Sequence, residues 1–129
     1  MTADKFRIVA EPRHCLLRIT MRDHWTIETV AAYKTALLPV VDRLLASGCA
    51  RGKMVALVDT RNGGAQSQDV IAEYQRQLGG SDLAPRRLAT IVSSALVKRQ
   101  VERIAIPNQQ LFTDEDEALA WLLSPDEDA

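Results

Sequence analysis

The sequence predicts a single-domain α/β sandwich, with a mostly parallel five-stranded sheet and an antiparallel first strand. Three observations predict this class. Strand-like segments alternate with segments whose apolar residues recur every three or four positions. The apolar run 54–58 is nearly unbroken, as in a strand covered on both faces. Only residues 11–14 separate the first two strand-like segments, a hairpin length that makes this pair antiparallel.

The first half of the chain is expected to form two strands and a long helix. The strands are expected at 6–10 and 15–21, and apolar and polar residues alternate well in the second. Thr26 is the expected N-cap of the helix and Gly48 its end. Pro39 is expected to kink or break the helix about halfway, because proline removes one helical hydrogen bond. The predicted apolar stripe of this helix consists of Ile27, Val30, Ala31, Leu37, Leu38, Val41, Leu44 and Leu45.

The third strand and the second helix follow. The strand is the apolar run that ends at Asp59. Ser67 is expected to cap the second helix, which reaches the glycine pair 79–80. The apolar stripe expected on this helix is Val70, Ile71, Tyr74 and Leu78.

Two further strands and two helices complete the pattern. A strand is expected at 87–93 and another at 110–112. The helix between them spans 94–103, and Thr113 is expected to cap a last helix that Pro125 stops. The element order is therefore β-β-α-β-α-β-α-β-α. Leu96, Val97 and Val101 are the residues of the third helix expected to face inward.

Length and composition are those of one globular domain. The 129 residues are 47% hydrophobic and 26% charged. We assign 1–125 to the domain and 126–129 to an acidic C-terminal tail. No apolar run approaches the roughly 20 residues of a membrane-spanning helix. The first residues lack the basic and apolar regions of a signal peptide, so a cytoplasmic location is expected.

Two isolated cysteines and two histidines offer little metal-binding chemistry. Neither Cys15 nor Cys49 has a ligand-type neighbour at a zinc-site spacing, and the histidines are His14 and His24. No metal and no cofactor are therefore predicted. We expect the cysteines to be buried thiols, while a disulfide between them stays open.

Charge is unevenly distributed along the chain. Residues 1–113 contain all 16 Lys and Arg, whereas residues 114–129 contain seven acids and no base. The basic residues are scattered and the chain has few aromatic residues, which is a poor pattern for nucleic-acid binding. No nucleic-acid partner is predicted, and the acidic end is interpreted as a solvated helix start and tail.

The candidate functional segment is the loop after the third strand. Ligands and partners of parallel sheets gather at the C-terminal ends of the strands. Basic residues at 86 and 87 stand at the approach to the next strand and are candidate anion contacts. The predicted binding or regulatory residues are Asp59, Thr60, Arg61, Asn62, Gly63, Gly64 and Ser67, and the candidate anion contacts are Arg86 and Arg87.

Four features of the sequence carry a family resemblance: the element order, Asp59 at a strand end, the approach 85–89 to the next strand and the ending 112–122. Together they resemble the STAS fold of anti-sigma-factor antagonists and the related SpoIIAA-like group. That group also invites comparison with the lipid-binding Sec14 domain. The resemblance implies a regulatory or protein-interaction module. In the antagonists, this loop carries a phosphorylatable serine in an Asp-Ser-Ser-Gly type motif. Here the stretch 66–69 departs from that motif, and Ser67 is the nearest counterpart, either as a phosphate acceptor or as a plain helix cap.

Three functions remain open from sequence. The first is a non-catalytic module that holds a protein partner through the loop 60–67. The second is a carrier of a lipid or small anionic ligand, admitted when the first helix moves from the sheet, with Arg61, Arg86 and Arg87 near the headgroup. The third, a small enzyme, would use Asp23 and His24 with Asp59 or Cys49. A homodimer through strand 6–10 or the first helix is a further hypothesis.

Overall fold

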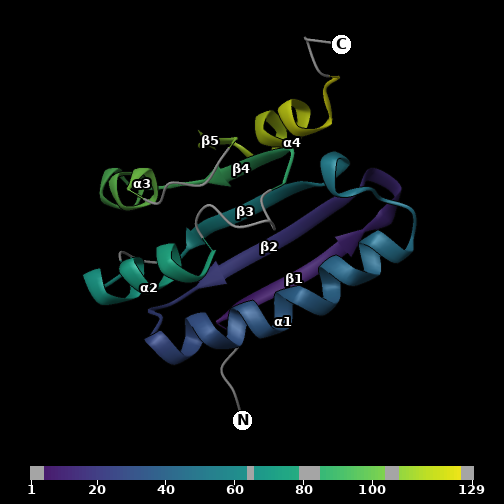
Figure 1. Ribbon diagram of the computed structural model, residues 1–129. Helices are drawn as coiled ribbons and strands as arrows, with labels where there is room; N and C mark the ends of the chain where they lie inside the picture. The colour runs from purple at the N-terminus through teal and green to yellow at the C-terminus, as the bar shows by residue number, and fades with distance from the viewer. Residues whose placement is uncertain (1–4, 64–65, 79–84, 104–107, 126–129) are drawn as a thin grey trace.

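The computed structural model describes residues 5–63, 66–78, 85–103 and 108–125 (Figure 1). Gly64 of the predicted loop and the predicted tail 126–129 lie outside the described residues.

A five-stranded sheet forms the centre of the protein. Its strands are β1 (Phe6–Glu11), β2 (Leu16–Arg22), β3 (Val55–Asn62), β4 (Arg87–Ile91) and β5 (Gln109–Phe112). They lie side by side in chain order. β1 is antiparallel to β2 and every other pair is parallel, so the predicted sheet is confirmed.

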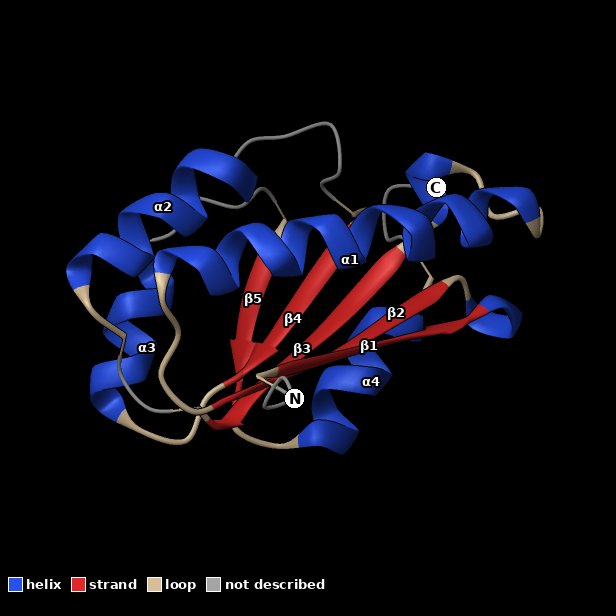
Figure 2. Cartoon of the chain, turned by 90° about the horizontal axis from the view of Figure 1, so that it is seen from below, coloured by secondary structure: helices blue, strands red, loops and turns tan. Residues whose placement is uncertain are grey.

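In the described part of the chain, four α-helices surround this sheet: α1 (Ile27–Ala46), α2 (Gln68–Leu78), α3 (Ala95–Glu102) and α4 (Glu115–Leu123). Short 3-10 helices at Pro12–His14 and Arg51–Lys53 precede β2 and β3. Figure 2 shows α1 and α2 on one side of the sheet and α4 on the other. The predicted order of strands and helices is therefore confirmed, because consecutive parallel strands need a crossover helix.

The long helix α1 runs through Pro39 without interruption, so the predicted break is wrong. Thr26 and Thr29 form a capping box at its start, in which the Thr26 side chain accepts from the Thr29 N–H and Thr29 accepts from the Thr26 N–H. Buried residues on both sides of the proline hold the helix against the sheet. This packing offsets the hydrogen bond that Pro39 removes.

The larger hydrophobic core lies between the sheet and α1 and α2. We call this side of the sheet the α1–α2 face. The buried residues of this core are Leu17, Ile19, Trp25, Val30, Tyr33, Leu37, Val40, Val41, Leu44, Cys49, Met54, Ala56, Val58, Val70 and Leu88. Ile27 and Leu38 of the predicted stripe are instead 45% and 39% exposed, because they point away from the sheet.

The smaller core lies beneath α4, on what we call the α4 face. Ala89 of β4 and Ala118 of α4 are both fully buried, and their small side chains let the helix lie close to the strand. The other buried residues are Leu16, Val55, Leu57, Ile91 and Leu122. The N-cap of α4 is Asp114 and not Thr113 as expected, since the Asp114 carboxylate accepts the Glu117 N–H at 2.9 Å.

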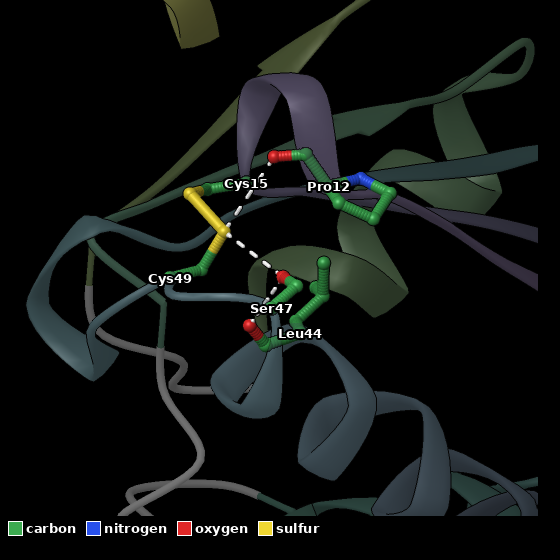
Figure 3. Close-up of a disulfide and its surroundings, with 5 residues drawn as sticks. All are labelled: Pro12, Cys15, Leu44, Ser47 and Cys49. Atoms are coloured by element: carbon green, nitrogen blue, oxygen red, sulfur yellow. Dashed lines mark hydrogen bonds between the residues drawn. A yellow bond between two sulfur atoms is a disulfide. The ribbon is translucent and has the colours of Figure 1, made fainter.

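Cys15 and Cys49 form a disulfide, so the expectation of buried thiols is wrong (Figure 3). The Val55 N–H donates to the Cys15 carbonyl at 2.9 Å, which places the starts of β2 and β3 side by side. Cys49 follows α1 and precedes β3, and its Cα lies 5.6 Å from that of Cys15. Strand pairing therefore unites two cysteines that are 34 positions apart in sequence.

Candidate functional site

At the C-terminal end of β3, the side chains of successive predicted residues lie on opposite faces of the sheet, because side chains alternate along a strand. Thr60 is buried on the α1–α2 face, and its hydroxyl donates to the Ile91 carbonyl at 2.6 Å. Asp59 and Arg61 lie on the α4 face. β3 extends to Asn62, so residues 60–62 belong to the strand and not to a loop as expected. The predicted loop residues therefore do not form one cluster.

Asp59 and Arg61 belong to a network of ion pairs that crosses the α4 face. The Arg61 guanidinium lies 2.8 Å from Asp59 Oδ2 and 3.0 Å from Glu115 Oε1. Arg18 of β2 lies 3.2 Å from the same Glu115 carboxylate and 2.8 Å from Glu11. The network ties β1, β2 and β3 to the start of α4. Its charges are already compensated inside the molecule.

The network shifts the ionisation of its members. The hydrogen bond from the Arg61 side chain lowers the pKa of Asp59, although partial burial opposes the effect. The same hydrogen bond raises the pKa of Arg61, and the hydrogen bond to Glu11 raises that of Arg18. Asp59 is thus held as a carboxylate and is a poor general base at neutral pH.

The remainder of the predicted loop reaches the start of α2. Ser67 is the N-cap of this helix, as predicted, and its hydroxyl accepts the Val70 N–H at 3.2 Å. The Gly63 N–H donates to the Thr60 carbonyl at 3.0 Å, which turns the chain after β3. The exposed Asn62 accepts the Asp23 N–H through its carbonyl at 3.2 Å.

Gln66, which sequence reasoning missed, is the best-anchored residue of this loop. Its carboxamide oxygen accepts the Trp25 N–H at 2.6 Å, and its carboxamide nitrogen donates to the Asp23 carbonyl at 2.9 Å. Its backbone N–H and carbonyl both bond to the Gln100 carboxamide of α3, at 2.7 and 2.6 Å. Four hydrogen bonds thus join three separate segments. A single glutamine in a loop carries no sequence signal for this role.

A pocket opens beside this junction, between the sheet, α2 and α3. Figure 1 shows both helices near the end of the sheet toward which the arrows of β2, β3 and β4 point. The cavity volume is about 80 Å³, or about 680 Å³ when the open mouth is included. The lining is predominantly apolar and comprises Met21, Trp25, Val58, Thr60, Gly63, Gln66, Val70, Ile71, Tyr74, Leu88, Thr90, Val97, Gln100, Val101 and Gln109.

The polar groups at the floor of the pocket are largely satisfied by the protein. The Thr60 hydroxyl donates to the Ile91 carbonyl, and the Thr90 hydroxyl donates to the Gln109 carboxamide oxygen at 2.7 Å. None of the described residues that line the pocket is an acid, a base or a histidine. The surface presented to a guest is therefore neutral and suited to apolar groups.

Two pocket residues also belong to an aromatic cluster. Trp25 and Tyr74 have ring centroids 6.4 Å apart, and Tyr33 lies 5.3 Å from Trp25 and 5.9 Å from Tyr74. Burial raises the pKa of Tyr74 to about 12 and that of Tyr33 well above its ordinary value. Both phenols are neutral at physiological pH, so the pocket wall adds no charge.

Arg86 and Arg87 lie at the beginning of β4, at the opposite end of the strands from the β3 loop. Arg86 donates to the Leu122 carbonyl at 3.2 Å, and Arg87 donates to the Trp121 carbonyl. The Arg87 guanidinium also lies 5.2 Å from the centre of the Trp121 ring. Both residues contact the last turn of α4, where the helix dipole stabilises positive charge. The structure does not bring them together with Asp59 or Ser67.

The structure separates only one of the residues considered for catalysis from the others. The Asp23 N–H donates to the Asn62 carbonyl at 3.2 Å, so Asp23 lies at the same end of β3 as Asp59. Cys49 is in the disulfide before the start of that strand. In the residues that the structure covers, no three His, Cys, Asp or Glu side chains are grouped to hold a metal ion. Within that same part of the chain, no helix has the length and apolar character needed to cross a membrane.

Comparison with known proteins shows the fold. The structure is similar to that of an uncharacterised protein of the DUF3478 family with a SpoIIAA-like fold from Shewanella loihica PV-4, with a TM-score of 0.63 and 21% sequence identity. The match covers 95% of this chain and 98% of the other. The protein thus has the SpoIIAA-like fold, as the sequence resemblance implied. No family model and no curated protein matches the sequence.

Proposed function

We propose that this protein is a non-catalytic binding domain that holds a small, mainly apolar ligand between the sheet, α2 and α3. The observation that carries the proposal is the apolar pocket at the C-terminal ends of the parallel strands. This end of an α/β sheet is where ligands commonly bind. The proposal corresponds to the carrier hypothesis from sequence, but the ligand enters beneath α2 and α3 and not beneath α1.

The size of the pocket indicates how the ligand enters. An apolar cavity of about 150 Å³ is enough for benzene. The cavity volume here is only about 80 Å³, so a guest larger than this must extend into the mouth of the pocket or push its walls outward. α3 is suited to such a shift, because Val97 is its only buried side chain and Leu96 is 59% exposed.

The two neighbouring valine and leucine positions of α3 provide a matched test. Val97→Phe fills the pocket from its wall, whereas Leu96→Phe places the same ring on the exposed side of the same helix. Binding is measured by the fluorescence of the neutral dye Nile red, and thermal unfolding verifies that both variants fold. We expect Val97→Phe to lose most of the dye signal and Leu96→Phe to retain it. Equal binding by the two variants would refute the pocket as the binding site.

A second candidate is the regulatory protein-interaction module. The exposed Ser67 cap favours it, since a partner or a modifying enzyme can reach this position beside the rim of the pocket. Native mass spectrometry of the protein from its own cells discriminates between the two functions. A retained apolar ligand supports the binding domain, whereas a phosphate or a co-purifying protein supports the module.

A further inference from the structure

We propose that the ligand is an amphipathic anion, whose carboxylate or phosphate group binds Arg103 in the hollow between α2 and α3 while its apolar part fills the pocket. This inference rests on the proposed function, because it assigns the second half of the same ligand. Arg103 thus takes the place of Arg61, Arg86 and Arg87, the headgroup contacts expected from the sequence.

The hollow and the apolar pocket are adjoining spaces. The hollow is lined by Gln68, Ile71, Ala72, Gln75, Gln100 and Arg103. Ile71 and Gln100 line both spaces, so one molecule can occupy the two together. The pocket is almost entirely apolar, whereas three carboxamides and one guanidinium border the hollow. This division of apolar and polar lining matches a molecule with an apolar chain and a polar head.

The charge of the hollow is positive. Among the described residues that line it, Arg103 is the only charged one, and none is an acid. Within the part of the chain that the structure describes, no carboxylate forms an ion pair with Arg103. Arg18, Arg61 and Arg76 differ in this respect, since each contacts a carboxylate. A planar guanidinium that is free of an internal acid is a suitable ligand for a carboxylate or a phosphate.

Gln100 adds a second donor at the boundary of the two spaces. Its carboxamide nitrogen donates one hydrogen to the Gln66 carbonyl. A primary carboxamide has two such hydrogens, and among the described residues none accepts the other, so it can bond to a ligand headgroup. The headgroup would then be held between α3 and the loop before α2.

The test compares three probes on the full chain by calorimetry. Octanoate has both the chain and the charge, 1-octanol has the chain alone, and acetate has the charge alone. We expect octanoate to bind more tightly than either of the others. Arg103→Gln is expected to weaken octanoate binding about fivefold, as for a partly exposed ion pair, and to leave 1-octanol binding unchanged.

Arg99→Gln is the matched control. Arg99→Gln removes a guanidinium from the last turn of α3, next to the C-cap residue Arg103, but Arg99 lines neither space. Octanoate binding that is retained in Arg99→Gln and weakened in Arg103→Gln supports the headgroup site. An equal loss of octanoate binding in both variants would show a non-specific effect of positive charge near α3, and it would overturn the headgroup site at Arg103. Binding of 1-octanol as tight as that of octanoate overturns the headgroup site alone, whereas no binding of either compound overturns the pocket as well.

Discussion

The two faces of the sheet are covered in different ways. On the α4 face, one short helix lies close to the strands through small, fully buried side chains such as Ala89 and Ala118. On the α1–α2 face, a larger core surrounds aromatic residues and a disulfide, and α2 and α3 leave a pocket above β3 and β4. The comparison teaches that the same sheet combines a tightly packed stabilising side with a side that has room for a guest.

The largest expected effect comes from the same truncation made on each face. Leu122→Ala, on the α4 face, should cost about 3.5 kcal/mol of unfolding free energy, because a closed cavity remains. Leu88→Ala, which borders the pocket, should cost about 2 kcal/mol because solvent can enter the enlarged space. Urea unfolding measures both values. Equal costs would contradict the difference in packing.

The disulfide contributes to the α1–α2 face. Replacing Cys15 and Cys49 together by Ser should lower the unfolding free energy by about 3 kcal/mol, a typical contribution of one disulfide. Thermal or urea unfolding provides the measurement. The wild-type protein in reducing agent is the control and should have the stability of the double variant. A double variant as stable as the oxidised wild type would show that the crosslink has no stabilising role.

The buried Tyr33 and the partly buried Tyr74 make the α1–α2 face sensitive to alkaline pH. The folded-state pKa of Tyr74 is about 12, above the ordinary value of 10.0, so the folded protein keeps the phenol proton more tightly than the unfolded chain. The resulting stability is fully present below pH 10 and is lost as the pH rises toward 12. The loss should reach up to about 2 kcal/mol and should decrease in Tyr74→Phe. The near-ultraviolet absorbance of tyrosinate follows the titration, and ordinary titration of both tyrosines in the folded protein would refute the expectation.

The smallest effect is expected from the ion pairs of the α4 face. The pKa of Asp59 is lowered, so its contribution is present above the ordinary value of 3.8 and is lost as the pH falls through the folded-state value. Arg61→Gln should therefore cost only about 0.5 kcal/mol near neutral pH, because this guanidinium is 41% exposed, and almost nothing in strong acid.

Arg7→Gln is the control for this pair. Arg7 is exposed on β1, and among the described residues no carboxylate forms an ion pair with it. Its replacement should change stability by a similar small amount at both pH values or not at all. A loss in Arg61→Gln that persists in strong acid would show that the side chain stabilises the fold by packing and not by charge.

Local patterns were sufficient to predict the elements, and they failed where distant segments meet. Thr26 and Ser67 were identified as helix caps because a cap depends on its own turn. The break at Pro39 and the inward position of Leu96 were wrong, since both depend on what packs against the helix. The strand was expected to end at Asp59, but β3 continues to Asn62, so residues 60–62 are strand and not loop, and strand alternation divides their side chains between the two faces.

The sequence by itself determined the order of strands and helices and the antiparallel first strand, because hydrophobic periodicity and short-range turns are encoded over a few residues. The SpoIIAA-like fold was indicated by a resemblance to that group, and the structural comparison confirmed it. The tertiary structure alone decided the pairing of Cys15 with Cys49, the junction of Gln66 with Gln100, and the pocket beside it. Each of these brings together residues at least 34 positions apart, and no local pattern specifies which distant side chains become neighbours.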